Sequence, residues 1–162
     1  MEQGNMGQGG MSGATMRGHY WMLVLNIAVS TAIMYVLMFG MIFSFAEFYN
    51  NFNMFYMALT MAMPMGIVML VLMRSMYSDQ RLNLILYGLF AAVLVLAFVA
   101  VRTQALVGDK QFLRSMIPHH SGAVLMCEQA KLSDPEIKQL CSGIIRSQTQ
   151  EIDQMKTILK RL

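Results

Sequence analysis

Three long apolar blocks, none with a formally charged side chain, constrain the fold of this 162-residue chain more than any other feature. The blocks cover residues 22–45, about 54–73 and about 82–101, and none contains Lys, Arg, Asp or Glu. A helix of about 20 apolar residues crosses the roughly 30 Å hydrocarbon core of a bilayer. We therefore expect an all-α chain in which residues 21–103 form three transmembrane helices, with the lipid bilayer as a partner.

The segments on either side of these blocks differ in composition. Residues 1–20 are glycine-rich and polar, with methionines at positions 1, 6, 11 and 16. This segment has too little apolar surface for a core, so we expect a disordered tail that is either a plain linker or a trap for a soft cation. After Arg102 the pattern becomes amphipathic, which predicts a small soluble domain over residues 108–162.

Charges in the loops predict the orientation of the chain. The tail carries Arg17 and the second loop carries Arg74 and Arg81, whereas the first loop has Glu47 and neither Lys nor Arg. The positive-inside rule then places the N-terminus in the cytoplasm and, after three crossings, the C-terminal domain outside. We expect the first block to be an uncleaved anchor. Three basic side chains near the third block weigh mildly the other way: Arg102, Lys110 and Arg114.

Two apolar stripes with helical spacing run through the C-terminal domain and predict an antiparallel hairpin. The first stripe is Leu113, Met116, His120, Ala123, Cys127 and Ala130. The second stripe is Ile137, Cys141, Ile144, Gln148, Glu151, Met155, Ile158 and Leu162. Residues 133–135 form the turn, Asp109 is the expected N-cap of a first helix that runs to about Lys131, and the second helix continues to Lys160.

The hairpin places the two cysteines opposite each other. Cys127 faces Cys141 in this register. A disulfide, two small buried thiols and a metal-binding thiolate pair all fit these positions. An outside location favours the disulfide over the thiolate pair, because disulfides persist in oxidising compartments.

The same register gathers polar and sulfur-bearing side chains in one layer of the hairpin. His120 is expected opposite Gln148, and Glu151 beside Met116. Imidazole and thioether donors together suit copper or silver, so we expect a soft-metal site here. Met116, His119 and His120 are the principal candidate ligands, followed by Met155 and Glu151; Met126 and Gln148 complete the set, with packing favoured for the first and a structural role for the second. The alternative is a buried hydrogen-bond network that fixes helix register.

These residues also carry a family resemblance. The sequence Met-x-x-His-His at 116–120, followed by Gln-x-x-Glu-Ile-x-x-Met at 148–155, resembles the domain-of-unknown-function 305 family over roughly residues 109–159. The resemblance implies a ferritin-like helical bundle, usually exported, in a family linked to copper and silver handling. It does not extend to the three apolar blocks or to the tail.

Many members of that family carry two such hairpins, whereas this chain carries one. A single two-helix hairpin buries little apolar surface. We therefore expect a homodimer in which two hairpins complete a four-helix bundle.

The function expected from the sequence is capture or tolerance of Cu(I), Cu(II) or silver by a bacterial inner-membrane protein with a periplasmic hairpin. The chain is not expected to be an enzyme, because paired carboxylates, a nucleophile–base set and a phosphate loop are all missing from its motifs. A net charge of +3 from scattered basic residues gives no support for nucleic-acid binding.

Two other functions stay open. A copper channel or importer would use the methionines that recur every fourth residue in the second block, and the layout of three spans with a Met-rich tail is similar to that of the eukaryotic high-affinity copper transporters. These methionines are Met57, Met61, Met65, Met69 and Met73. A structural or accessory membrane subunit would have the same polar layer and bind no metal.

Overall fold

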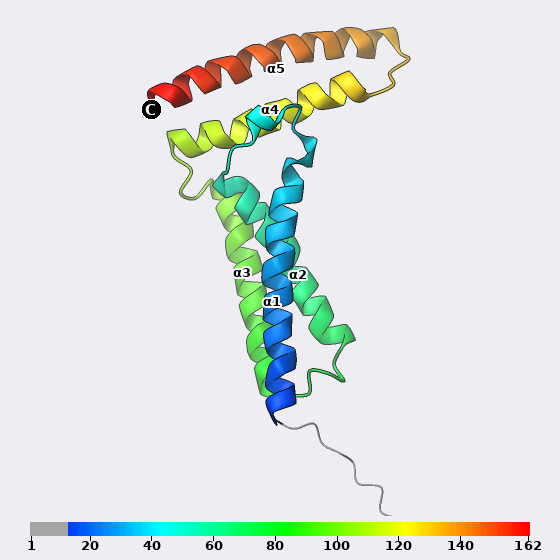
Figure 1. The fold of residues 1–162 in the computed structure, drawn as a ribbon, viewed down its shortest axis with the longest axis vertical. Coiled ribbons are helices and arrows are strands. Elements are labelled where there is room, and N and C mark those ends of the chain that lie inside the picture. Colours follow the sequence, from blue (N-terminus) through cyan, green and yellow to red (C-terminus); the bar gives the residue numbers. More distant parts are fainter. Residues whose placement is uncertain (1–12) are drawn as a thin grey trace, which may run out of the picture.

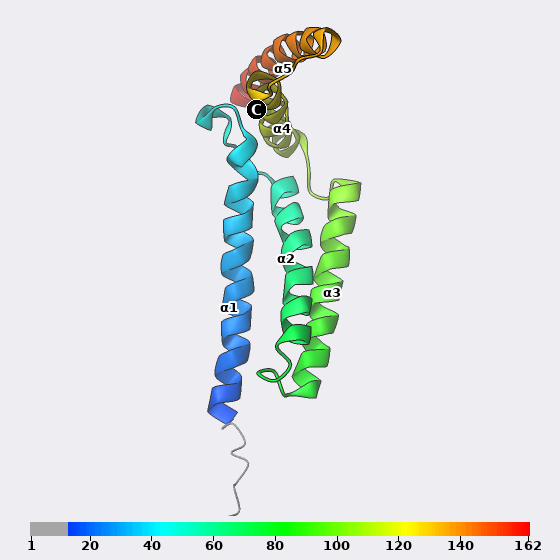
Figure 2. The same ribbon diagram turned by 90° about the vertical axis from the view of Figure 1, so that its right-hand side faces the viewer.

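The computed structural model describes residues 13–162, and every regular element in that part of the chain is a helix. Five long helices are present: α1 (Gly13–Leu37), α2 (Phe52–Leu72), α3 (Gln80–Thr103), α4 (Asp109–Gln129) and α5 (Pro135–Arg161). The first three run side by side, and α4 and α5 form a hairpin that lies across one end of them (Figure 1). Seen from the side, α4 and α5 are viewed almost end-on while α1–α3 stand upright (Figure 2). The all-α architecture predicted from the sequence is confirmed.

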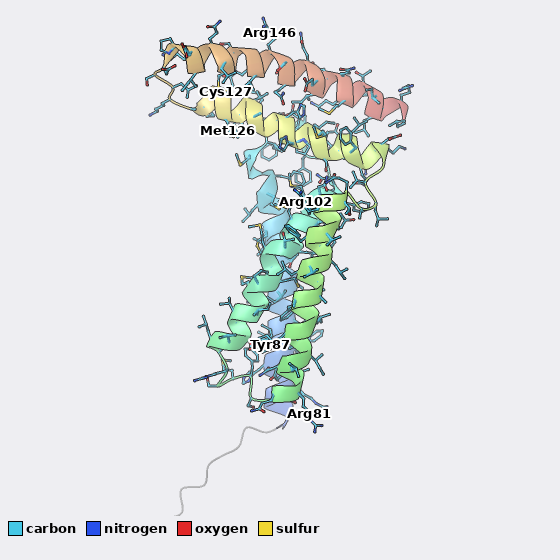
Figure 3. The ribbon with its side chains drawn as sticks, turned by 180° about the vertical axis from the view of Figure 1, so that it is seen from behind. Arg81, Tyr87, Arg102, Met126, Cys127 and Arg146 are labelled. Carbon is cyan, nitrogen blue, oxygen red and sulfur yellow. A yellow bond between two sulfur atoms is a disulfide. The ribbon has the colours of Figure 1, made fainter. Side chains whose placement is uncertain are left out.

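The three long apolar helices match the predicted spans. Each is long and apolar enough to cross a membrane, over Arg17–Met41, Phe52–Leu72 and Gln80–Thr103. Between a sixth and just over a quarter of each segment is buried inside the protein, so most of the apolar surface faces outward, as a lipid environment requires. Figure 3 shows Arg81 and Arg102 at the two ends of α3, with the apolar stretch between them.

The first span differs from the prediction at both ends. Because α1 begins at Gly13, the tail predicted over residues 1–20 overlaps the helix from that point; its methionines at 1, 6 and 11 lie outside the described residues. At the other end the apolar block predicted to run to residue 45 leaves the α-helix at Leu37. It continues as two short 3-10 helices, η1 (Met38–Met41) and η2 (Phe45–Glu47), which turn the chain beneath the hairpin.

Close packing between α2 and α3 depends on one glycine. A Cβ atom at Gly66 would lie 2.8 Å from the ring of Phe90, a separation that real Cβ contacts do not adopt, so only glycine lets the two helices approach there. Leu23 of α1 and Leu70 of α2 are almost completely buried in the same cluster. The spans therefore form one bundle with a thin apolar core.

The hairpin ends are capped in different ways. Asp134 is the N-cap of α5 and accepts hydrogen bonds from the backbone nitrogens of Glu136 (2.8 Å) and Ile137 (3.0 Å), within the turn that the sequence predicted. The predicted N-cap role of Asp109 is wrong: Gly108 is the N-cap of α4, without a side-chain hydrogen bond, and Asp109 is the first helical residue. There its carboxylate still lies at the positive end of the helix dipole.

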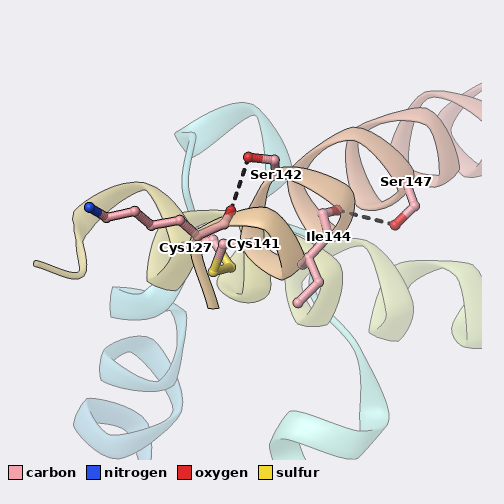
Figure 4. Close-up of a disulfide and its surroundings, with 6 residues drawn as sticks. Cys127, Cys141, Ser142, Ile144 and Ser147 are labelled. Atoms are coloured by element: carbon pink, nitrogen blue, oxygen red, sulfur yellow. Dashed lines mark hydrogen bonds between the residues drawn. A yellow bond between two sulfur atoms is a disulfide. The ribbon is translucent and has the colours of Figure 1, made fainter. Parts of the chain in front are cut away.

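A disulfide joins the two helices near their turn. Cys127 of α4 and Cys141 of α5 are bonded, with their Cα atoms 5.3 Å apart (Figure 4). The facing positions predicted from the stripes are confirmed. The cysteines are therefore neither free buried thiols nor a thiolate pair available to a metal in this structure.

The buried face of α4 is turned relative to the predicted stripe. Ile117 and Ser121 are completely buried, although neither belonged to that stripe, and Ile152 of α5 is buried as well. The reason is that α4 is covered on two sides, by α5 and by the loop that contains η1 and η2. The predicted stripe considered the hairpin alone, so it accounts only for the side of α4 that α5 covers.

Candidate metal centre

The central contact of the candidate site joins His120 of α4 to Glu151 of α5. His120 Nδ1 lies 3.0 Å from Glu151 Oε2, and the side chains are 12% and 49% exposed. The predicted neighbour of His120 was Gln148, one turn earlier on α5. The Nδ1 atom is buried, and the carboxylate approaches it without the alignment of a hydrogen bond. A buried ring nitrogen with an imperfect partner is a polar atom whose burial is not fully compensated.

The surroundings of His120 favour its neutral form. Burial is the main cause and lowers the pKa of the imidazole below its ordinary value of 6.5; the Glu151 carboxylate raises this pKa and His119 lowers it, with a net decrease. Only a neutral imidazole has a lone pair for a metal ion. The histidine is therefore in a binding-competent state at neutral pH.

Two thioethers lie in the adjoining turns. Met155 is 9% exposed and belongs to a small buried cluster with Leu113, Ile117 and Ile152, against which Met116 packs. Met116 precedes His120 by one turn of α4, and Met155 follows Glu151 by one turn of α5. The structure therefore brings the sulfur-bearing side chains to one cluster and the imidazole to a carboxylate in the next layer.

The remaining candidates lie elsewhere. His119 is exposed on another face of α4, with its ring centroid 6.2 Å from that of His120. Met126 is 59% exposed and lines the same cavity as His119, on the side of α4 that faces η1 and α2. Gln148 is half-buried on α5. The seven residues predicted as one site are thus divided between two faces of α4 and their neighbours.

The donor set differs from that of a site built from nitrogen and carboxylate ligands. Within residues 13–162, no group of three or more His, Cys, Asp or Glu side chains is placed to hold a metal ion. Such a group is typical of zinc sites. The His120–Glu151 pair alone is smaller than such a group.

A buried polar network beside this site was not predicted from the sequence. Glu47 of η2 is 8% exposed, and its carboxylate accepts hydrogen bonds from Ser121 of α4 and from Lys156 of α5, whose Nζ is 3.1 Å away. Ser121 also accepts a hydrogen bond from the backbone nitrogen of Phe43, at 2.6 Å. This Glu47 network fixes the first loop to both helices of the hairpin. The only sign of this network in the sequence was Glu47, a single acidic residue in an otherwise uncharged loop. From the sequence, Glu47 was used only to predict the orientation of the chain.

A second polar contact ties the membrane unit to α4. Asn51 is 3% exposed and is the N-cap of α2, where its Oδ1 accepts from the backbone nitrogen of Met54 at 2.9 Å. The same oxygen accepts from the hydroxyl of Ser115 at 3.0 Å, and Nδ2 donates to the carbonyl of Arg114 at 3.4 Å. The position of α4 over the spans is therefore set by polar contacts at two points.

Comparison with known proteins agrees with the sequence motifs. The family described as "Domain of unknown function (DUF305)" matches residues 100–159. "Uncharacterized protein L153" of Acanthamoeba polyphaga mimivirus is 40% identical over 111 residues, which cover 67% of this chain and 71% of the viral protein. No solved structure matches the chain significantly. The chain belongs to the DUF305 family, and its DUF305 segment begins in the last turn of the third apolar helix.

Proposed function

We propose that the chain is a membrane-anchored protein that captures copper or silver in its α4–α5 hairpin. The observation that carries this proposal is the buried Nδ1 of His120, which lies 3.0 Å from Glu151 without an aligned hydrogen bond. Met116 and Met155 lie in the neighbouring turns. Imidazole nitrogen with thioether sulfur is a donor set that suits copper and silver.

Each side chain has a distinct role in this proposal. His120 gives the nitrogen ligand, and Met116 and Met155 give sulfur. Methionine has three rotatable bonds, so its sulfur reaches an ion by a change of rotamer without movement of the helices. Glu151 either binds the ion directly or orients the imidazole as an acceptor, which is a common arrangement around metal-bound histidine.

We place the hairpin on the extracytoplasmic side of a bacterial inner membrane, in the periplasm. The disulfide between Cys127 and Cys141 supports this placement, because disulfides persist in oxidising compartments. Loop charge supports it as well, since Arg74 follows α2 and Arg81 lies in the first turn of α3. Figure 3 shows Arg81 at the end of the bundle away from the hairpin.

Capture is better supported than transport along α2. Met57 and Met61 are 41% and 53% exposed, whereas Met65 and Met69 pack against the core of the bundle. These thioethers point in different directions, so within one chain they do not line a single path. A channel would need them to share one surface.

We also propose that two hairpins pair into a four-helix bundle. Ile137 and Leu140, on the first two turns of α5, are 47% and 62% exposed and form an apolar surface that a second copy would cover. Mass measurement of the detergent-solubilised protein tests this point. A strictly monomeric particle would contradict the dimer and leave the metal site unaffected.

The metal proposal is tested with the purified full-length protein in detergent. Binding of Ag(I) and Cu(I) is measured for the wild type and for His120→Ala and Glu151→Gln. We expect an ion bound at this site to stabilise the wild-type protein against heat, by about 2.7 kcal/mol at a hundredfold excess of ion over Kd, and His120→Ala to lose this contribution. Asp153→Asn, an exposed acid on the same helix, is the matched control for Glu151→Gln.

Two results decide between metal capture and a structural role. If neither ion changes the thermal stability of the wild type, the polar layer serves packing alone and the metal proposal is wrong. If His120→Ala binds the ions as the wild type does, the site has been assigned to the wrong residues.

A further inference from the structure

A second group of sulfur-bearing side chains lies on the membrane-facing side of α4. It surrounds a cavity of about 330 Å³ between α4, η1 and the start of α2. The donor-bearing residues of its lining are Met38, Met41, Met54, His119 and Met126. None of them belongs to the His120–Glu151 pair or to the Met116–Met155 cluster.

Three separate segments of the chain build this cavity. Met38 and Met41 belong to η1, directly after α1, and Met54 lies in the first turn of α2. His119 and Met126 come from α4, two turns apart. The convergence depends on the way α4 lies across the bundle, so no local sequence pattern reveals it.

The cavity is held in place by a close contact at its edge. A Cβ atom at Gly122 would lie 3.4 Å from the backbone oxygen of Met41 and 4.0 Å from its Cβ. These are ordinary van der Waals separations, so α4 lies directly against η1 there. The adjacent Glu47 network fixes the same loop to the hairpin, so the methionines of η1 keep their position relative to His119.

The chemistry of the lining selects one class of ligand. Four methionines and one histidine line the cavity, and no carboxylate does; the other lining residues are Ile42, Pro118, Gly122 and Ala123. Hard cations such as Ca²⁺ and Mg²⁺ need oxygen ligands and find none among these side chains. Thioethers with a histidine instead suit Cu(I) or Ag(I), whose single charge is also less costly to bring to the membrane surface.

Packing alone is a weak explanation for these methionines. Met41 and Met126 are 55% and 59% exposed, so they contribute little to a core. They nevertheless converge with Met38, Met54 and His119 on one space. We infer that this cavity is a second soft-metal site, which binds Cu(I) or Ag(I) on the membrane-facing side of α4. This second site shares no residue with the site built on His120 and Glu151. An experiment can therefore disprove one site and leave the other standing.

The test removes sulfur from the cavity while side-chain volume is kept. The triple variant Met38→Leu, Met41→Leu and Met54→Leu is compared with the control triple Met22→Leu, Met61→Leu and Met73→Leu, which changes exposed methionines outside the cavity. Ag(I) equivalents per chain are counted by equilibrium dialysis of the full-length protein in detergent. We expect the cavity triple to lose one equivalent and the control triple to lose none.

His120→Ala, measured in parallel, separates this inference from the proposed function. His120→Ala should remove one bound Ag(I) per chain, and the cavity triple should remove another. A variant that combines both sets of changes should therefore lose both ions. Unchanged Ag(I) binding by the cavity triple overturns the second site whatever His120→Ala does. Loss of one and the same equivalent in both variants also overturns it, because the protein then has a single site.

A measurement on the wild type avoids any doubt about the folding of variants. Methionine labelled with ¹³C in its methyl group gives one NMR signal per side chain, and Ag(I) bound to sulfur shifts that signal. We expect Ag(I) to shift the signals of Met38, Met41 and Met54 and to leave that of Met22 in place. Unshifted signals for the three cavity methionines would overturn the inference.

Discussion

The two histidines of α4 are neighbours in sequence, yet they belong to opposite environments. His120 lies against α5, mostly buried, with a carboxylate at 3.0 Å. His119 lies on the exposed, membrane-facing side, in a cavity lined by methionines. Consecutive residues of a helix point about 100° apart, so one His-His pair reaches both faces. A single short motif can therefore serve two sites once its helix is covered on two sides.

The two faces of α4 are also held by different interactions. Toward α5, the contact rests on a small apolar cluster and the disulfide between Cys127 and Cys141. Toward the membrane unit, it rests on the Glu47 network and on Asn51. Changes can therefore be aimed at one face and leave the other intact.

The largest effect is expected from removal of the disulfide. The bond closes a loop with a sequence separation of 14, for which cross-linking stabilises a fold by about 3 kcal/mol. We expect Cys127→Ala with Cys141→Ala to speed amide hydrogen exchange in α5, as measured by mass spectrometry, and to leave η1 unchanged. Ser142→Ala beside Cys141 is the control. Equal exchange in α5 of both variants would show that the apolar cluster alone holds the hairpin.

A smaller effect is expected from Glu47→Ala, which removes the contact of the first loop with both helices of the hairpin. The change leaves the buried Ser121 hydroxyl and the Lys156 ammonium group without their acceptor, and a charged hydrogen bond of this kind contributes about 2 kcal/mol. Thermal unfolding in detergent should move to lower temperature, and exchange should increase over residues 38–47. Glu128→Ala, at an exposed position of α4, should behave as the wild type. If both glutamate variants unfold alike, the network does not hold this interface.

Much of the architecture could be predicted because it depends on local patterns. Charge-free blocks of about 20 residues predicted the three spans, and two stripes with helical spacing predicted the hairpin and the pairing of Cys127 with Cys141. The helix boundaries were less accurate. The N-cap of α4 is Gly108, which has an extended backbone. The sequence instead indicated the next residue, Asp109, because aspartate is a favoured N-cap residue.

The division of the site could not be predicted, because it depends on contacts between distant segments. Both histidines were expected around one ion, since the hairpin was considered without the loop beneath it. That loop covers Ser121 and Gly122 and gives His119 its methionine neighbours. The partner of His120 also differed by one turn, because helix register is set by such packing and not by spacing alone.

Paired substitutions of the two histidines sharpen the comparison at the level of binding. We expect His119→Gln to weaken Ag(I) binding about tenfold at the cavity only, a change of 1.4 kcal/mol, and His120→Gln to do the same at the α5 face only. Competition titrations with a chromophoric chelator measure both affinities. Equal weakening of both affinities by either variant would mean that the two imidazoles bind a single ion.

The smallest effect concerns the charge of His120. Burial holds its pKa below 6.5 in the folded state, so the unfolded chain binds more protons as the pH falls through that value. Stability should therefore decrease on acidification from pH 6.5 toward the folded pKa. NMR titration of the imidazole, assigned by its loss in His120→Gln, should give a midpoint below 6.5. A midpoint at or above that value would show that Glu151 outweighs burial.

The Glu47 network has a consequence for the order in which the protein is made. Glu47 is separated from Ser121 by 74 positions and from Lys156 by 109, so its loop leaves the ribosome long before either partner is translated. The final helix of the chain then completes the network, and a ribosome that stalls before α5 releases a product in which Glu47 has Ser121 of α4 as a partner but lacks Lys156.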